Sequence, residues 1–190
     1  MKVKDKFINI PENLNLVFFE KDLKFYVENN LTKENCFIIL PPFLDFSKES
    51  DFRYKFFIKE FYLKYYASKM MLYTFVSKFQ IEIKGIGESY KGTINIKGLG
   101  YSVAVTKLEN NKHSLFFRFG FKDTFTYIMP SSINIENAAV AKIQLILNCK
   151  NLELLKKVQI QIRNFRKPKA FKLQGIYLNN IFPKVKKFVK

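Results

Sequence analysis

The sequence contains no tryptophan, a single histidine (His113) and two cysteines, Cys36 and Cys149. Two cysteines are too few for a disulfide scaffold or for a four-ligand zinc site. One histidine provides little material for acid–base catalysis, in which histidine is the most frequent participant. These counts disfavour a zinc site and histidine-based catalysis, and we expect no cofactor, no metal ion and no small-molecule substrate.

Long uncharged segments are also absent. The longest, Thr124–Ile135, has 12 residues, whereas a membrane-spanning helix needs roughly 18 or more. Membrane insertion is therefore not expected. The first 84 residues contain no glycine, and all seven glycines follow from Gly85 onward. Because glycines mark tight backbone turns, this change in composition predicts a domain boundary near residue 85.

Acidic residues are missing from the C-terminal part of the chain. The net charge is +17, and no acid follows Glu153, although the last 37 residues contain 11 bases. Unopposed cations repel one another unless a polyanion neutralises them. This pattern favours a nucleic-acid partner, with an acidic membrane surface as the alternative. The bases are Lys156, Lys157, Arg163, Arg166, Lys167, Lys169, Lys172, Lys184, Lys186, Lys187 and Lys190.

Two segments have the length and periodicity of helices. Phe56–Phe79 contains no glycine or proline, and its aromatic residues recur at helical spacing, which predicts a face packed on a sheet (Phe57, Phe61, Tyr65 and Tyr73). The second helix is expected to begin after an N-cap at Asn151 and to end before Pro168. Its apolar residues form one face (Leu152, Leu155, Val158, Ile162 and Phe165), and Lys156, Arg163 and Lys167 lie on another.

The remaining regular segments resemble strands. Apolar and polar residues alternate in Gln80–Lys84 and Thr93–Lys97, among several other candidates in both halves. Each half thus contains several strands and one helix, followed by a Gly-Ile pair at Gly85-Ile86 and Gly175-Ile176. The sequence predicts an α+β fold of two tandem similar domains, each a mostly antiparallel sheet with one helix on one face. The expected domains are residues 1–84 and 85–183, followed by a basic extension over 184–190.

Two glycine pairs invite comparison with phosphate-binding loops. Neither Gly85-Ile86-Gly87 nor Gly98-Leu99-Gly100 completes the G-x-G-x-x-G pattern or leads into an expected helix. Structural turns are therefore expected at Gly85, Gly98, Gly100 and Gly120. Most aromatic side chains are expected in the core, but Phe171 and Tyr177 lie in the basic region, where they are expected to reach RNA.

Three blocks of sequence resemble the family of protein six of the large ribosomal subunit. Residues 85–101 read GIGESYKGTINIKGLGY, residues 119–133 read FGFKDTFTYIMPSSI, and residues 163–177 read RNFRKPKAFKLQGIY. The second half is covered almost end to end, whereas the first half is covered only by Ile8–Pro11 and the helix leading to Gly85. Gln174 and Tyr177 stand where the family has a lysine and an arginine.

The resemblance implies a non-enzymatic structural constituent of the large ribosomal subunit, near the sarcin-ricin loop and the stalk base. Large-subunit ribosomal RNA and neighbouring ribosomal proteins are the implied partners, and no homo-oligomer is expected. The residues expected to bind ribosomal RNA are Lys156, Arg163, Arg166, Lys167, Lys169, Phe171, Lys172, Gln174, Gly175, Tyr177, Lys184, Lys186, Lys187 and Lys190. The alternative function is a free RNA-binding or RNA-processing factor.

The composition also bears on location. Lys, Asn, Ile, Phe and Tyr, which have A/T-rich codons, account for 96 of the 190 residues. Ile8–Pro11 resembles the start of the mature family domain, so no cleavable transit peptide is expected. We therefore expect synthesis inside an organelle and a place in the mitochondrial matrix, with a plastid or an A/T-rich bacterial cytoplasm as the alternatives.

Overall fold

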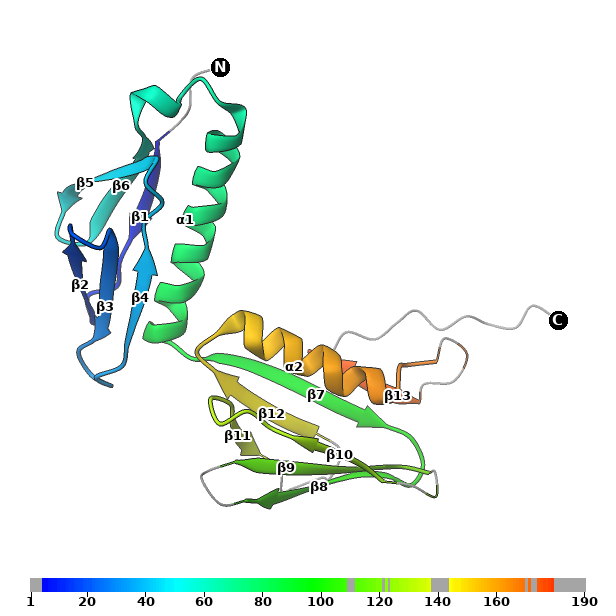
Figure 1. Cartoon of the computed structure of the whole chain (residues 1–190). Helices are drawn as coiled ribbons and strands as arrows, with labels where there is room; N and C mark the ends of the chain where they lie inside the picture. Colours follow the sequence, from blue (N-terminus) through cyan, green and yellow to red (C-terminus); the bar gives the residue numbers. More distant parts are fainter. Residues whose placement is uncertain are drawn as a thin grey trace. The chain divides into compact units, whose positions relative to one another are not determined.

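The computed structural model describes residues 5–108, 112–120, 122, 124–137, 144–169, 171 and 174–179. The chain divides into two compact units, Met1–Glu88 and Ser89–Lys190, and each contains antiparallel strands and one long α-helix (Figure 1). The predicted α+β fold class is therefore confirmed. No helix in the described part of the chain is both long and apolar enough to cross a membrane.

The first unit has six strands followed by a helix. Its sheets have the strand orders β1-β6-β5 and β2-β3-β4, and all pairs are antiparallel. A short 3-10 helix, η1, precedes the long helix α1. The elements are β1 (Lys6–Asn9), β2 (Leu14–Phe19), β3 (Lys24–Asn29), β4 (Asn35–Ile39), β5 (Leu44–Ser50), β6 (Arg53–Ile58), η1 (Glu60–Tyr62) and α1 (Tyr66–Gly87).

The second unit repeats this order and adds one strand after its helix. In both units the sixth strand lies between the first and the fifth, and the second, third and fourth strands form a separate sheet. The strand orders are β11-β12-β7-β13 and β10-β9-β8. The elements are β7 (Tyr90–Lys97), β8 (Tyr101–Lys107), β9 (His113–Phe119), β10 (Phe125–Ile128), β11 (Asn134–Asn137), β12 (Gln144–Cys149), α2 (Leu152–Phe165) and β13 (Gly175–Leu178). The units are thus similar, and each has two sheets where one was expected.

Aromatic rings fill the core of the first unit. Phe25 and Phe56 are fully buried, and each packs against Phe79 of α1 with ring centroids 5.3 Å apart. Tilted and edge-to-face contacts of this kind add to the stabilisation that burial of the rings provides. The face of α1 that carries Phe79 therefore packs on the sheets.

The helix predicted over Phe56–Phe79 is wrong at both ends. Arg53–Ile58 forms β6, in which every second side chain is buried, and α1 begins only at Tyr66. At the other end, Gln80–Lys84 is not a strand but continues α1. Ile83 and Ile86 follow Phe79 at spacings of four and three residues and are buried with it. The predicted turn at Gly85 is therefore wrong, because Gly85 is a buried helical residue.

The aromatic stripe expected to pack on a sheet is also largely exposed. Phe61 is 75% exposed and Tyr65 57% exposed, and both precede α1. Tyr73 lies in α1 but is 42% exposed, because the buried face of that helix runs through Leu72, Phe75 and Val76. The helical spacing of these aromatic residues was misleading, because they do not share one helix. Phe57 lies in β6, Phe61 in η1 and only Tyr73 in α1.

Burial, together with the smaller effect of the nearby Glu82 carboxylate, raises the pKa of the Cys36 thiol to about 11. We expect iodoacetamide at pH 8 to alkylate Cys36 at least roughly tenfold more slowly in the native chain than in the urea-unfolded chain. The thiolate is the nucleophile, so a higher pKa removes reactive thiolate, an effect only partly offset by the greater nucleophilicity of a more basic thiolate. Mass spectrometry of the Cys36 peptide measures both rates. Equal rates would contradict the expectation.

Candidate RNA-binding surface

Helix α2 presents a row of cations to solvent. The side chain of Asn151 accepts a hydrogen bond from the Leu154 N–H at 3.0 Å, as expected of an N-cap. Leu155, Val158 and Ile162 are buried beneath α2, which lies on the β11-β12-β7-β13 sheet (Figure 1). These features confirm the helix predicted between Asn151 and Pro168.

An exposed flank of α2, beside its buried face, carries Lys156, Arg163 and Lys167, the last just beyond the helix end. Ile160, which is 50% exposed, lies between them at spacings of four and three residues from Lys156 and Arg163. Among the ion pairs formed by described residues, none involves these three cations. Their charge therefore faces solvent with no acidic partner in the described chain.

The backbone after α2 forms a closed loop that continues this surface. The Ile176 N–H donates to the Arg166 carbonyl at 2.9 Å, and the Lys169 N–H donates to the Gln174 carbonyl at 3.2 Å. The Arg166 Nε donates to the Tyr101 hydroxyl at 3.1 Å. Lys167 and Lys169, which lie beside these hydrogen bonds, are exposed.

Gly175 allows the two sides of the loop to meet. Its φ is +143°, and a Cβ at this position would lie 2.6 Å from the Pro168 Cα. Residues that carry a Cβ rarely adopt such a φ, and no Cβ fits at that distance from a backbone atom. Gly175, which was expected to bind ribosomal RNA, is buried and makes its close approach to the protein's own backbone.

The structure brings only part of the predicted set to the surface. Phe171 is 52% exposed, and Gln174 is half-buried. The expected contact of Tyr177 with RNA is contradicted, because its ring is 1% exposed in β13, a strand that pairs with β7 and packs against α2. Lys172, Lys184, Lys186, Lys187 and Lys190 lie outside the described residues.

Tyr101 is a contributor to this surface that the sequence analysis missed as a site residue. Gly98, with φ +157°, precedes it in the turn between β7 and β8, and a Cβ on Gly98 would lie 2.6 Å from the Tyr101 ring. The ring is thereby placed where its hydroxyl reaches Arg166. Gly100 and Gly120 also have positive φ values, both +72°. The Gly-Leu-Gly-Tyr block in the sequence indicated a turn before Tyr101. Only the fold shows that the Tyr101 side chain meets Arg166 at the end of α2.

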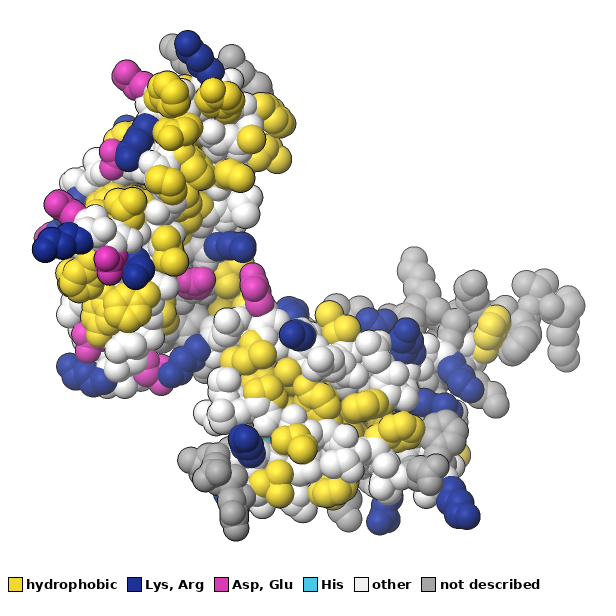
Figure 2. Space-filling model, viewed as in Figure 1, with side chains coloured by type: hydrophobic (Ala, Val, Ile, Leu, Met, Phe, Trp, Pro, Cys, Tyr) yellow, Lys and Arg dark blue, Asp and Glu magenta, His cyan; other side chains and the backbone are white. Residues whose placement is uncertain are grey.

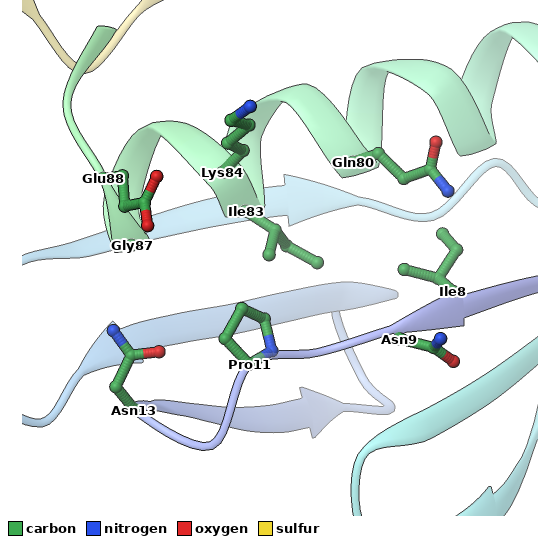
Figure 3. Close-up of a pocket in the computed structure, with 9 residues that line it drawn as sticks. All are labelled: Ile8, Asn9, Pro11, Asn13, Gln80, Ile83, Lys84, Gly87 and Glu88. Carbon is green, nitrogen blue, oxygen red and sulfur yellow. The ribbon is translucent and has the colours of Figure 1, made fainter.

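A pocket of about 330 Å³ lies in the first unit, between the chain around β1 and the last turns of α1. Figure 3 shows Ile83 directed toward Ile8 and Pro11, with Lys84 pointing away from them. Glu88 is the one carboxylate among the described residues that line it. Paired carboxylates of the kind used in general acid–base hydrolysis are therefore not brought together in this lining. The described residues also contain no group of three His, Cys, Asp or Glu side chains placed to hold a metal ion.

Comparison with known proteins identifies relatives of this chain. No family model matches it. It is 31% identical over 100 residues to large ribosomal subunit protein uL6 of Borrelia hermsii, covering 52% of this chain and 51% of the relative. The corresponding protein of Borrelia turicatae is 32% identical over 100 residues, with the same coverage. That of Buchnera aphidicola is 29% identical over 108 residues, or 57% of each chain.

The chain spans about half the length of the curated relatives it matches. All three relatives carry the same name, and it is the family indicated by the three sequence blocks. Over about half of its length, this chain is therefore similar to large ribosomal subunit protein uL6.

Proposed function

We propose that this protein is a structural constituent of the large ribosomal subunit, that it binds large-subunit ribosomal RNA, and that it catalyses no reaction. The observation that carries the proposal is the row of exposed cations on α2, in a chain whose relatives are large-subunit proteins. The charge is concentrated in one unit. The second unit has 19 bases and 4 acids, whereas the first has 14 bases and 12 acids.

The proposed interaction is electrostatic and depends on RNA shape. Lys156, Arg163 and Lys167 neutralise phosphates and release counterions, a contribution that weakens as salt rises. Arg163 offers a planar guanidinium that can hold a phosphate with two hydrogen bonds, which a lysine cannot do. Because contacts of cations with phosphates carry no base-sequence information, we infer recognition of folded RNA through its backbone.

We further propose a position near the sarcin-ricin loop and the stalk base, with neighbouring ribosomal proteins as additional partners and no self-association. This position is supported by the resemblance of residues 85–101, 119–133 and 163–177 to the family. A mitochondrial location is supported by the A/T-rich codon composition. The relatives compared above are bacterial, which also fits the alternative of an A/T-rich bacterial cytoplasm.

Sedimentation of ribosomes from the source cells tests the proposal. We expect the chain to travel with large subunits and to remain bound when they are washed at moderate salt. Separate analysis of mitochondria and cytosol distinguishes the locations. A chain found only outside the subunit fraction, bound to other RNAs, would overturn the ribosomal assignment in favour of a free RNA-binding or RNA-processing factor.

Removal of residues 184–190 is expected to weaken binding to large-subunit ribosomal RNA and to flatten its salt dependence. The segment contains four lysines, and each lost phosphate contact reduces the slope of log K against log salt by about 0.7 to 0.9. Filter binding over a series of KCl concentrations measures this slope. As a control, a Cys36→Ser chain should retain full affinity and slope, and an unchanged slope after truncation would remove the tail from the interface.

A further inference from the structure

The outer face of the β2-β3-β4 sheet exposes apolar side chains in the first unit. Val17, Tyr26 and Phe37 lie side by side across the three strands. Phe19 and Ile39 flank them on the edge strands, where each is paired with Lys24 of β3. These five apolar residues are called the sheet patch below. Figure 2 shows hydrophobic side chains gathered on the visible surface of this unit over β2, β3 and β4.

Both faces of the β2-β3-β4 sheet carry apolar side chains, one facing the core and the other forming the sheet patch. Phe25, Val27 and Ile38 point to the other side and are buried in the core. Phe37 is nevertheless 60% exposed and Ile39 66% exposed. Antiparallel sheets with one solvated face normally place polar residues there. Contiguous exposed apolar side chains of this kind mark sites where another molecule binds.

The electrostatics of the sheet patch disfavour RNA. Residues 14–40 contain four acids and three lysines, in a chain with a net charge of +17. Glu28 lies on the same face of the central strand and accepts a hydrogen bond from the Tyr26 hydroxyl at 3.4 Å. Lys24 is 3.4 Å from the Asp22 carboxylate. A phosphate backbone laid across this face would meet carboxylates, and the lysine nearest the rings already has an acidic partner.

The ring geometry agrees with this conclusion. Tyr26 and Phe37 are inclined to one another by 48°, and Phe19 and Tyr26 by 69°. Successive bases stack on accessible ring faces, whereas these rings lean on each other and share the surface with aliphatic Val17 and Ile39. A second copy of the chain is also a poor occupant. Self-association would bring together two chains that each carry a net charge of +17 and repel one another.

We propose that the sheet patch binds a protein neighbour in the large subunit, through a segment of apolar side chains flanked by lysine or arginine. The apolar side chains cover Val17, Phe19, Phe37 and Ile39, and the flanking cations face Glu28 and, at the edge of the sheet, Glu20. Charge complementarity of this kind fixes the register of an apolar contact. This inference rests on the proposed function, which supplies the subunit as the place of contact.

Photo-crosslinking in assembled subunits tests the inference. A benzophenone amino acid is placed at Phe37 in one variant and at Phe52 in a matched control. Phe52 is also an exposed phenylalanine of the first unit, 45% exposed, in the turn between β5 and β6. After irradiation of purified large subunits, we expect the probe at Phe37 to give one protein adduct that the probe at Phe52 does not give. Mass spectrometry should locate it on a peptide with apolar residues and lysine or arginine.

The outcomes separate the two proposals. An adduct with ribosomal RNA, an adduct with a second copy, or no adduct in subunits that contain the chain would overturn this inference alone. Absence of the chain from the subunits would overturn the proposed function, and this inference with it. Glu28→Gln, in the background of the probe at Phe37, should lower the adduct yield about fivefold, since a lost charge pair at an interface rim is worth about 1 kcal/mol. An unchanged yield would overturn the assignment of a basic partner segment.

Discussion

Simultaneous replacement of Lys156, Arg163 and Lys167 by alanine is expected to weaken binding of large-subunit ribosomal RNA on the order of 100-fold. The three cations lie on one exposed surface of α2 and its C-terminal end. Three lost contacts at about 1 kcal/mol each correspond to this factor, because 1.4 kcal/mol is a tenfold change. The slope of log K against log salt should fall by about 2 to 3. Filter binding at several KCl concentrations measures affinity and slope together.

A matched triple variant in the first unit controls for net charge. Lys21, Lys64 and Lys78 are exposed, and their replacement by alanine removes the same three charges from the other unit. We expect this control to lose less than threefold in affinity and to keep its slope, because long-range attraction is screened at moderate salt. Equal losses in both variants would show that net charge, and not the α2 surface, determines binding. Thermal unfolding of both variants should be close to that of the unaltered chain.

The α2 region could be predicted from the sequence because its signals are local and agree with one another. Asn151 is a capping residue, and Leu155, Val158 and Ile162 recur at helical spacing before Pro168. The face that packs is therefore fixed by residues within one helix, and the cations on the other face follow from it. This agreement of capping, periodicity and termination is what specifies a helix before any tertiary contact forms.

The region around α1 could not be predicted in the same way, because its local patterns conflict with the tertiary fold. Phe56 and Phe57 are adjacent aromatic residues, and the alternation of β6 is visible only once Phe56 is known to be buried and Phe57 is not. In Gln80–Lys84 the spacing of Ile81 and Ile83 is that of a strand, yet only Ile83 belongs to the buried face of α1. Tertiary packing thus outweighed both local patterns.

Two features of the candidate surfaces depend on the fold itself. The burial of Tyr177 follows from the place of β13 beside β7 and against α2, which no spacing along the chain indicates. The sheet patch likewise depends on register, since Val17, Tyr26 and Phe37 are distant in sequence and adjacent only across the paired strands. Charge composition could identify the half that we propose binds nucleic acid, but it could not identify the apolar face of the other half.

Gly175→Ala is expected to lower the free energy of unfolding by about 3 kcal/mol. The added Cβ would lie 2.6 Å from the Pro168 Cα and 2.8 Å from its nitrogen. Both are backbone atoms, so no side-chain rotation relieves the overlap, and the φ of +143° adds strain for any residue with a Cβ. Urea unfolding followed by circular dichroism measures the loss.

Gly100→Ala provides the matched control, because Gly100 also has a positive φ, +72°, but no atom lies within 4 Å of the Cβ position. Its cost should be limited to the backbone strain of a left-handed residue, about 1 kcal/mol. The difference between the two variants then reports the close approach of β13 to Pro168. Since Lys167 and Lys169 flank Pro168, Gly175→Ala should also weaken RNA binding about tenfold under conditions where the chain remains folded. Equal destabilisation by the two substitutions would mean that the loop after α2 is not held against β13, and that its cations do not owe their position to Gly175.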